Sequence, residues 1–167
     1  MKLVADVKFL LNYNMKIISN LIEAHIFREQ NGKIEFLLLK RAPYQYYPNL
    51  WQMVSGKIKE NEKAYETALR EINEETGLTP EKIWIAPNIN SFYSPDDEYI
   101  SLIPVFAAKV KYDSSVKIST EHSEYKWLKP EEAKNLLAWE GQRKSVDLIT
   151  EYFLNRKSFL NFVEVKV

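Results

Sequence analysis

The apolar residues between positions 20 and 41 are spaced as in a β-hairpin. Two apolar runs, Leu21–Phe27 and Ile34–Leu39, flank a polar segment that contains the turn signal Asn31-Gly32. Within the second run, Phe36–Leu39 is apolar at every position, which is typical of a strand that is buried on both faces of a sheet. The sequence therefore predicts a hairpin near the start of the fold.

A helical period replaces this pattern within the segment Gly56–Leu78. One stripe of mostly apolar side chains is expected to face a core, and its members are Tyr65, Ala68, Leu69, Ile72 and Thr76. Glu71, Glu74 and Glu75 fall together on a flanking side, where we expect Glu74 and Glu75 to add nothing to packing. Gly77 follows the last periodic residue, at the position where a left-handed residue commonly ends a helix.

The remaining apolar runs predict further strands and helices. Strands are expected at Trp51–Val54, Ile83–Ala86, Ser91–Tyr93, Tyr99–Val110 and Tyr125–Leu128. A helix is expected to begin at Pro130, and a last helix is expected over Gln142–Asn155. The inward residues of that last helix are expected to be Val146, Ile149 and Phe153. The apolar tail Phe159–Val167 is expected to add an edge strand or to contact a partner.

Strands precede, surround and follow these helices, which predicts an α/β fold with a mixed sheet and helices on both faces. The chain has 167 residues and 46% of them are hydrophobic, which is enough for one domain with a full core. Residues 15–167 are interpreted as this domain. Residues 1–14 are interpreted as a possible N-terminal extension, because Met15 opens a plausible alternative start.

Charge and composition exclude several functions. The formal net charge is zero, so there is no global basic field, and we expect no nucleic-acid partner. Cysteine is absent, which excludes disulfides, thiol catalysis and thiolate metal sites. Neither a signal peptide nor an uninterrupted apolar span is visible, so we expect a cytoplasmic protein without membrane association.

The glutamates of the predicted helix point to a metal. Carboxylates one turn apart repel each other in an isolated helix, and a hard cation would remove that penalty. Oxygen ligands without cysteine or paired histidine favour Mg²⁺ or Mn²⁺ over zinc. Mg²⁺ takes one or a few carboxylates together with waters and phosphate oxygens, so substrate and metal are expected to bind as a unit.

The segment GKIKENEKAYETALREINEETGL, residues 56–78, resembles the Nudix box G-x5-E-x7-R-E-U-x-E-E-x-G-U, in which U is aliphatic, and every fixed position is filled. The resemblance covers residues 20–155 and implies an α/β/α sandwich. It also implies a hydrolase that cleaves a phosphoric anhydride bond by attack of a metal-bound water on phosphorus. The implied partner is a small nucleotide-like diphosphate or triphosphate.

The resemblance also assigns roles to residues in and beside the box. The implied metal ligands are Glu71, Glu74 and Glu75. The backbone carbonyl of Ser55 would complete the first site, and Gly56 would let the backbone approach a phosphate or metal closely. Arg70 would orient the site by pairing with carboxylates such as Glu62. A purely structural salt bridge between Arg70 and Glu62 is the other interpretation, and both stay open.

A second set of runs, LLLKR, LWQMVSG and TEHSEYKWL, followed by Trp139 and Gln142-Arg143, resembles the bacterial dATP and dihydroneopterin triphosphate pyrophosphohydrolases. On this resemblance Glu121 would join the metal site and serve as general base. The implied catalytic residues are then Arg70, Glu71, Glu74 and Glu121. Arg41 would contact phosphate, unless it only occupies a solvent-facing strand end.

Aromatic residues near the predicted mouth are candidates for stacking on a base or pterin ring. The candidates for this role are a cluster and one separate residue, and capping of a core is the alternative for each of them. The cluster is Tyr44, Tyr46, Tyr47 and Trp51, and the separate residue is Trp139. His122 is expected to lie at the surface or behind the ligands rather than to act in catalysis. The predicted products of a triphosphate are a monophosphate and pyrophosphate.

Other functions stay open from sequence. A dinucleoside polyphosphate or nucleotide-sugar pyrophosphatase is the main alternative, and Tyr93 and Pro95 point to different branches of it. A nucleotide-sensing binding module of the same fold is the alternative that is not an enzyme, although such modules often lose motif carboxylates. An RNA 5′-pyrophosphohydrolase is disfavoured without a basic groove. A homodimer is possible, since dimers are common among homo-oligomers.

Overall fold

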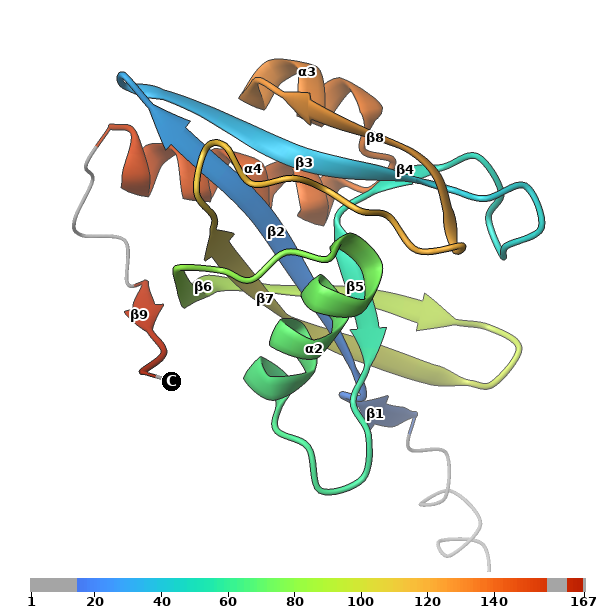
Figure 1. The fold of residues 1–167 in the computed structure, drawn as a ribbon. Coiled ribbons are helices and arrows are strands. Elements are labelled where there is room, and N and C mark those ends of the chain that lie inside the picture. Colours follow the sequence, from blue (N-terminus) through green and yellow to red (C-terminus); the bar gives the residue numbers. More distant parts are fainter. Residues whose placement is uncertain (1–14, 156–161, 167) are drawn as a thin grey trace, which may run out of the picture.

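The computed structural model describes residues 15–155 and 162–166 (Figure 1). The extension expected at residues 1–14 lies outside these residues, as do residues 159–161 and 167 of the expected edge strand. In the described part of the tail, β9 (Val163–Glu164) pairs antiparallel with β6 (Lys82–Ser94). An edge strand therefore forms there, as the apolar tail predicts.

β2 (Leu21–Gln30) and β3 (Lys33–Arg41) form the expected hairpin. Asn31 and Gly32 join them with φ values of 52° and 69°, the left-handed values that a two-residue hairpin turn between twisted strands requires. Phe36–Leu39 is fully buried, in agreement with the unbroken apolar run.

The described strands form one mixed sheet. Its main path is β4-β3-β2-β7-β6-β9, where β4 is Trp51–Gln52 and β7 is Tyr99–Lys109. One edge of β2 runs parallel to β7, while the other edge pairs with β3 and then with β5 (Val54–Lys57). β1 (Lys16–Ile18) adds to β7 in parallel, and β8 (His122–Leu128) adds to β3 antiparallel.

The two short strands expected at Ile83–Ala86 and Ser91–Tyr93 belong to the single strand β6, which corrects that prediction. The pairing of β6 with β7 shifts register between Ile85 and Ile89. Pro87 lies in this interval and has no backbone N–H to give to the ladder, so the pairing is interrupted but the strand continues.

Three other boundaries also differ from expectation. The run Trp51–Val54 is divided between β4 and β5, which pair with different strands, β3 and β2. β8 begins at His122 rather than Tyr125, because its pairing with β3 continues as far as Arg41. The last helix, α4, spans Glu140–Phe153 rather than beginning at Gln142, since the backbone is extended only up to Trp139. α3 (Pro130–Leu136) begins where the proline predicts.

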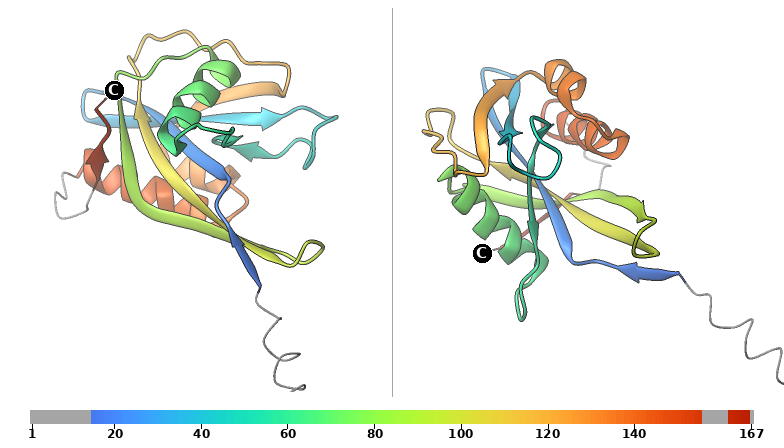
Figure 2. Two further views of the ribbon diagram at one scale, coloured as in Figure 1. Left: turned by 90° about the horizontal axis from the view of Figure 1, so that it is seen from below. Right: turned by 90° about the vertical axis from the view of Figure 1, so that its right-hand side faces the viewer.

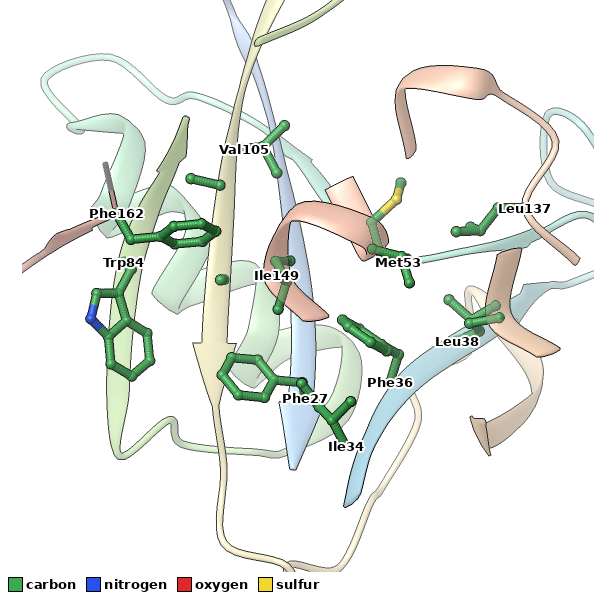
Figure 3. Close-up of a cluster of buried hydrophobic side chains, with 14 residues drawn as sticks. Phe27, Ile34, Phe36, Leu38, Met53, Trp84, Val105, Leu137, Ile149 and Phe162 are labelled. Carbon is green, nitrogen blue, oxygen red and sulfur yellow. The ribbon is translucent and has the colours of Figure 1, made fainter. Parts of the chain in front are cut away.

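Helices cover both faces of the sheet (Figure 2). α2 (Ala64–Thr76) packs on one face, with Ala68 and Ile72 in a core that includes Ile22 of β2. α3 and α4 pack on the other face, where Ile149 joins the cluster around Phe27 that Figure 3 shows. The α/β/α arrangement expected from the sequence is therefore confirmed. No helix in the described part of the chain is long and apolar enough to cross a membrane.

The stripe of α2 is buried at Ala68, Ile72 and Thr76, whereas Tyr65 and Leu69 are only partly buried. Gly77 ends the helix with φ 67°, as predicted. The expectation that Glu75 adds nothing to packing is wrong, because this side chain is 4% exposed. It is buried because the end of α2 packs against the segment before β8, and His122, the first residue of β8, is its hydrogen-bonding partner.

Candidate active site

Arg70 fastens α2 to the loop that precedes it. Its Nε and Nη2 donate to Oε1 and Oε2 of Glu62 at 2.7 and 2.9 Å, and Nη2 also donates to the carbonyl of Lys57 at 3.1 Å. Its Nη1 donates to Glu71 at 2.6 Å and to Glu74 at 3.0 Å. The Arg70 hydrogen bonds are the main cause that lowers the pKa of Glu62 to about 2. The pairing expected from the box thus exists, and one guanidinium joins a strand, a loop and a helix.

Gly56 allows the side chain of Glu71 to lie directly against β5. A Cβ atom at position 56 would stand 2.1 Å from Cγ and 2.4 Å from Oε1 of Glu71, closer than real side-chain atoms approach. Side chains alternate between the two faces of a strand, so Ser55 belongs to the opposite face, where it lines a cavity. β5 therefore has the box carboxylates on one side and the cavity on the other.

Glu75 and His122 form a buried pair behind this cluster. Oε2 of Glu75 lies 2.7 Å from Nε2 of His122, whose side chain is also buried. Burial raises the pKa of Glu75, the His122 contact lowers it, and the charges of Glu71 and Glu121 raise it again. The Coulombic effects show that Glu71 and Glu121 lie near Glu75. His122 thus lies behind a proposed ligand, in the position expected for it.

These carboxylates suit a hard divalent cation in their chemistry. All of them are oxygen donors of the kind that Mg²⁺ and Mn²⁺ prefer, and a cation would relieve the negative charge that accumulates around Glu75. No three His, Asp or Glu side chains in the described residues already converge as a finished metal cage. Arg70 binds Oε1 of Glu71 and Oε2 of Glu74, which leaves the second oxygen of each carboxylate for a cation.

A cavity of about 440 Å³ lies beside β5 on the α4 face. Much of its wall is apolar or aromatic, with contributions from Tyr47, Met53, Phe92, Ile103 and Trp139. The rings of Tyr47 and Trp139 pack edge to face with their centroids 5.8 Å apart. The volume falls in the usual range for small-molecule sites, and the aromatic wall suits a flat ring.

Glu23, Asn90 and Gln142 form a polar side of this cavity, which we call its floor. Glu23 is only 7% exposed, and it accepts hydrogen bonds from Nδ2 of Asn90 and, at 3.2 Å, from Nε2 of Gln142. Burial raises the pKa of Glu23, and the two amide hydrogen bonds lower it. Oε1 of Gln142 is buried and accepts no hydrogen bond from the described residues. The floor therefore presents acceptor atoms.

The remaining expected substrate contacts lie around the loop between β3 and β4. Arg41 donates from Nε to the carbonyl of Tyr46 at 2.5 Å and from Nη1 to Oε1 of Gln52 at 3.1 Å, so it orders this loop. Tyr46 is 77% exposed and does not line the cavity, whereas its neighbour Tyr47 does. Trp139 lines the cavity as well. The phosphate contact of Arg41 and the stacking role of Tyr46 stay predictions.

Glu121 lies immediately before β8, and its carbonyl accepts a hydrogen bond from the N–H of Ala42 at 2.9 Å. This contact holds the segment before β8 against the end of β3. The charge of Glu121 raises the pKa of Glu75, and its place among the metal ligands stays a prediction.

Sequence reasoning missed Glu23 and Asn90 as cavity residues, and Gln142 entered only through a resemblance. One signal was available, because Glu23 is the only acidic residue within the strand run LIEAHIF. A charged side chain inside an otherwise apolar strand needs partners when it is buried. No comparable signal marked Asn90, because its importance depends on contacts with strands and helices distant in sequence.

Comparisons with known proteins agree with this geometry. The family model of the NUDIX domain matches residues 23–149. A bis(5′-nucleosyl)-tetraphosphatase (asymmetrical) of Caenorhabditis elegans is 33% identical over 110 residues, which cover 65% of this chain and 77% of that protein.

Solved structures show the same fold. A NUDIX hydrolase structure from Listeria monocytogenes superposes with a TM-score of 0.70 at 25% identity and covers 82% of this chain and 95% of its own. The dihydroneopterin triphosphate pyrophosphohydrolase of Escherichia coli superposes with a TM-score of 0.64 at 20% identity. The superposition covers 81% of this chain and 95% of that protein, and at this identity it shows a likeness of fold alone. The box is complete, Arg70 and Gly56 make the contacts described above, and the NUDIX domain model matches most of the chain. The chain therefore belongs to the NUDIX family and is a hydrolase of phosphoric anhydride bonds.

Proposed function

We propose that this protein hydrolyses a dinucleoside tetraphosphate asymmetrically, to a nucleoside triphosphate and a nucleoside monophosphate. The observation that carries the proposal is the position of β5, on which Ser55 lines the ring cavity while the adjacent Gly56 contacts Glu71. A base in the cavity would lead its phosphate chain across β5 toward the carboxylates of α2. The name of the C. elegans relative, 33% identical to this chain, supports this substrate class.

The divalent cation, which we propose to be Mg²⁺ or Mn²⁺, has a ligand set drawn from the box and the segment before β8. Its proposed ligands are Glu71, Glu74, Glu75, Glu121 and the backbone carbonyl of Ser55. When bound, the cation offsets the negative charge of the phosphates and lowers the pKa of a water molecule. Arg70 positions Glu71 and Glu74, and His122 positions Glu75.

The chemical step is the addition of water across one phosphoric anhydride bond. The water oxygen forms a new bond to phosphorus, the bridging P–O bond breaks, and the leaving phosphate keeps the bridging oxygen. We propose Glu121 as the carboxylate that accepts the proton of the water. It comes from the segment before β8 rather than from α2, and its charge acts on Glu75 of the box.

A nucleoside triphosphate or dihydroneopterin triphosphate is the second candidate substrate. It is favoured by the presence of one ring cavity beside the carboxylates, since such a substrate has one ring to place. The same candidate is supported by the segments LLLKR, LWQMVSG and TEHSEYKWL, which contain Arg41, Ser55 and Glu121. The products would then be a monophosphate and pyrophosphate, formed at the same carboxylates.

Product analysis by ion-exchange chromatography tests the proposal. The purified protein is incubated with Mg²⁺ and, separately, with dinucleoside tetraphosphates, deoxynucleoside triphosphates, dihydroneopterin triphosphate and ADP-ribose. We expect equal amounts of nucleoside triphosphate and monophosphate from a tetraphosphate. Release of two nucleoside diphosphates would contradict the proposed cleavage, and turnover of triphosphates alone would favour the second candidate.

Matched variants make the test specific to the site. The double variant Glu74→Gln, Glu75→Gln should lose activity on every substrate. Glu131→Gln is the control, because Glu131 lies on α3 with 81% of its side chain exposed and undergoes the same change of charge. If the double variant kept the activity of the control, the assignment of the carboxylates would be wrong.

A further inference from the structure

The floor of the cavity is the end of a hydrogen-bond chain that starts on α4. Nδ2 of Asn88 donates to Oγ of Ser145 at 2.9 Å and to Oδ1 of Asn90 at 3.0 Å. Nδ2 of Asn90 then donates to Glu23, which fixes the orientation of the Asn90 amide. One N–H of the Asn90 amide is thus directed toward Glu23.

The Glu23 carboxylate keeps free acceptor capacity on this floor. Both carboxylate oxygens of Glu23 accept one amide hydrogen bond, and each has a further lone pair to offer. Nε2 of Gln142 donates one N–H to Glu23, and Oε1 of Gln142 is buried without access to the cavity. A ligand that supplies N–H donors to the two oxygens of Glu23 therefore gains affinity.

Ring edges differ in the donors that they can offer to such a floor. A 2-amino-4-oxo ring edge, as in guanine or a pterin, carries a ring N–H and an adjacent amino group. Adenine and cytosine offer an amino group next to a ring acceptor, and uracil or thymine offers one N–H between two carbonyl oxygens. Carbonyl oxygens and ring acceptors would face the carboxylate oxygens of Glu23 without a proton between them.

We infer that Glu23, held by Asn90 and Gln142, makes this cavity selective for a ring with two adjacent N–H donors, such as guanine or a pterin. The aromatic wall formed by Tyr47 and Trp139 accepts any flat ring, so selectivity among rings comes from the floor. The inference rests on the proposed function only in placing the ring of the substrate in this cavity.

Calorimetric binding of nucleoside monophosphates tests the inference without catalysis. Guanosine monophosphate should bind at least tenfold more tightly than inosine monophosphate, which lacks only the 2-amino group, and more tightly than the adenosine and uridine compounds. Equal binding of the guanosine and inosine compounds by the unaltered protein would overturn the inference. This comparison needs no variant, so it does not depend on how well an altered floor folds.

The variant Glu23→Gln assigns the selectivity to its residue. It should bring the affinities for guanosine and inosine monophosphate to within about twofold of each other, because the carboxamide offers one acceptor in place of two. A merely structural role would weaken all nucleotides equally and leave their ratio unchanged, which would contradict the assignment. Asp147→Asn, on the exposed side of α4, is the matched control and should keep the ratio.

The two proposals can fail separately. Tight, selective binding of guanosine monophosphate with no hydrolysis of any tetraphosphate would refute the proposed reaction and support the selectivity. Hydrolysis of diguanosine and diadenosine tetraphosphate with equal kcat/KM, together with equal binding of the monophosphates, would support the reaction and refute the selectivity.

Discussion

Gly56 and Gly141 are each required by one neighbouring side chain. A Cβ atom at Gly56 would stand 2.1 Å from Cγ of Glu71, and one at Gly141 would stand 2.3 Å from Oδ1 of Asn90. The first contact sets the position of a proposed metal ligand, and the second sets the amide that holds Glu23. At both positions the glycine gives room for a neighbouring functional group, and φ is not in the left-handed region.

Gly56→Ala should therefore affect activity more than stability. The added methyl group must displace the flexible side chain of Glu71, and a misplacement of about 1 Å can cost on the order of 100-fold in rate. We expect kcat to fall by about that factor, measured by steady-state hydrolysis alongside urea unfolding. Gly32→Ala is the control, because no atom lies within 4 Å of its Cβ, although φ is 69°. It should lower stability by about 1 kcal/mol and leave kcat unchanged.

His25 is fully buried on β2, and neither ring nitrogen has a hydrogen-bond partner among the described residues. Burial lowers its pKa from 6.5 to about 3. Below pH 6.5, His25 is protonated in the unfolded chain but stays neutral in the folded chain. The free energy of unfolding should therefore fall as the pH decreases from 6.5 toward 3. At pH 5 the loss should be about 2 kcal/mol.

Urea unfolding of the unaltered protein and of His25→Leu at pH 7 and pH 5 checks this expectation. The variant should lose less stability between the two pH values, because leucine does not titrate. Parallel losses in the two proteins would show that His25 does not cause the acid sensitivity.

At the scale of elements, Arg70 ties the loop between β5 and α2 to both of its flanking elements. Arg70 binds the carbonyl of Lys57 at the end of β5, the carboxylate of Glu62 in the loop, and Glu71 and Glu74 on the helix. The planar guanidinium makes this possible, because its five N–H groups form a fixed fork that an ammonium group cannot reproduce.

Arg70→Lys should loosen this loop. We expect hydrogen exchange of the amides of Lys59 and Lys63, which donate to Glu62 and Glu66, to accelerate at least tenfold. The rate of hydrolysis should fall as well, because Glu71 and Glu74 lose their positioning. Arg28→Lys changes another guanidinium that pairs with a carboxylate, Glu35, on β3, and should leave both quantities unchanged. If the hydrogen-exchange rates of these amides were unchanged in Arg70→Lys, the role of Arg70 in holding the loop would be contradicted.

For the whole molecule, the two functional regions lie on opposite faces of one sheet. α2 presents the box carboxylates on one face, and α4 with its preceding residue Trp139 borders the ring cavity on the other (Figure 2). The paired strands β2 and β5 lie between the box carboxylates and the cavity. This arrangement separates the residues proposed to hold phosphate and metal from those proposed to hold the ring.

Variants on the two faces should therefore act independently. Glu74→Gln should lower kcat for all substrates, and Trp139→Ala should raise KM for substrates with a ring. The free-energy losses calculated from kcat/KM should add in the double variant within about 0.5 kcal/mol, because the two residues share no contact partner among those described. A larger departure would mean that the ring site and the carboxylates are coupled across the sheet.

Much of the fold follows from local patterns. The β2–β3 hairpin, α2 with its terminal Gly77 and the start of α3 at Pro130 form where the sequence predicts them, because turn chemistry, helical period and proline geometry act over a few residues. The single strand β6 was not predicted, because Pro87 interrupts its apolar pattern and only pairing with β7 carries the strand past it. The burial of Glu75 was also missed, because its partner His122 is 47 positions away.

The sequence by itself determined the family box, the oxygen-rich ligand set and the period of each long element, since these depend on residue type and short spacing. Only the tertiary structure decided the floor of the cavity, where Glu23 meets Asn90 and Gln142 across 67 and 119 positions. No local preference specifies such contacts. They form because the sheet brings β2 beside β7 and β6 and because α4 packs across that face, which buries Glu23 where it needs amide donors.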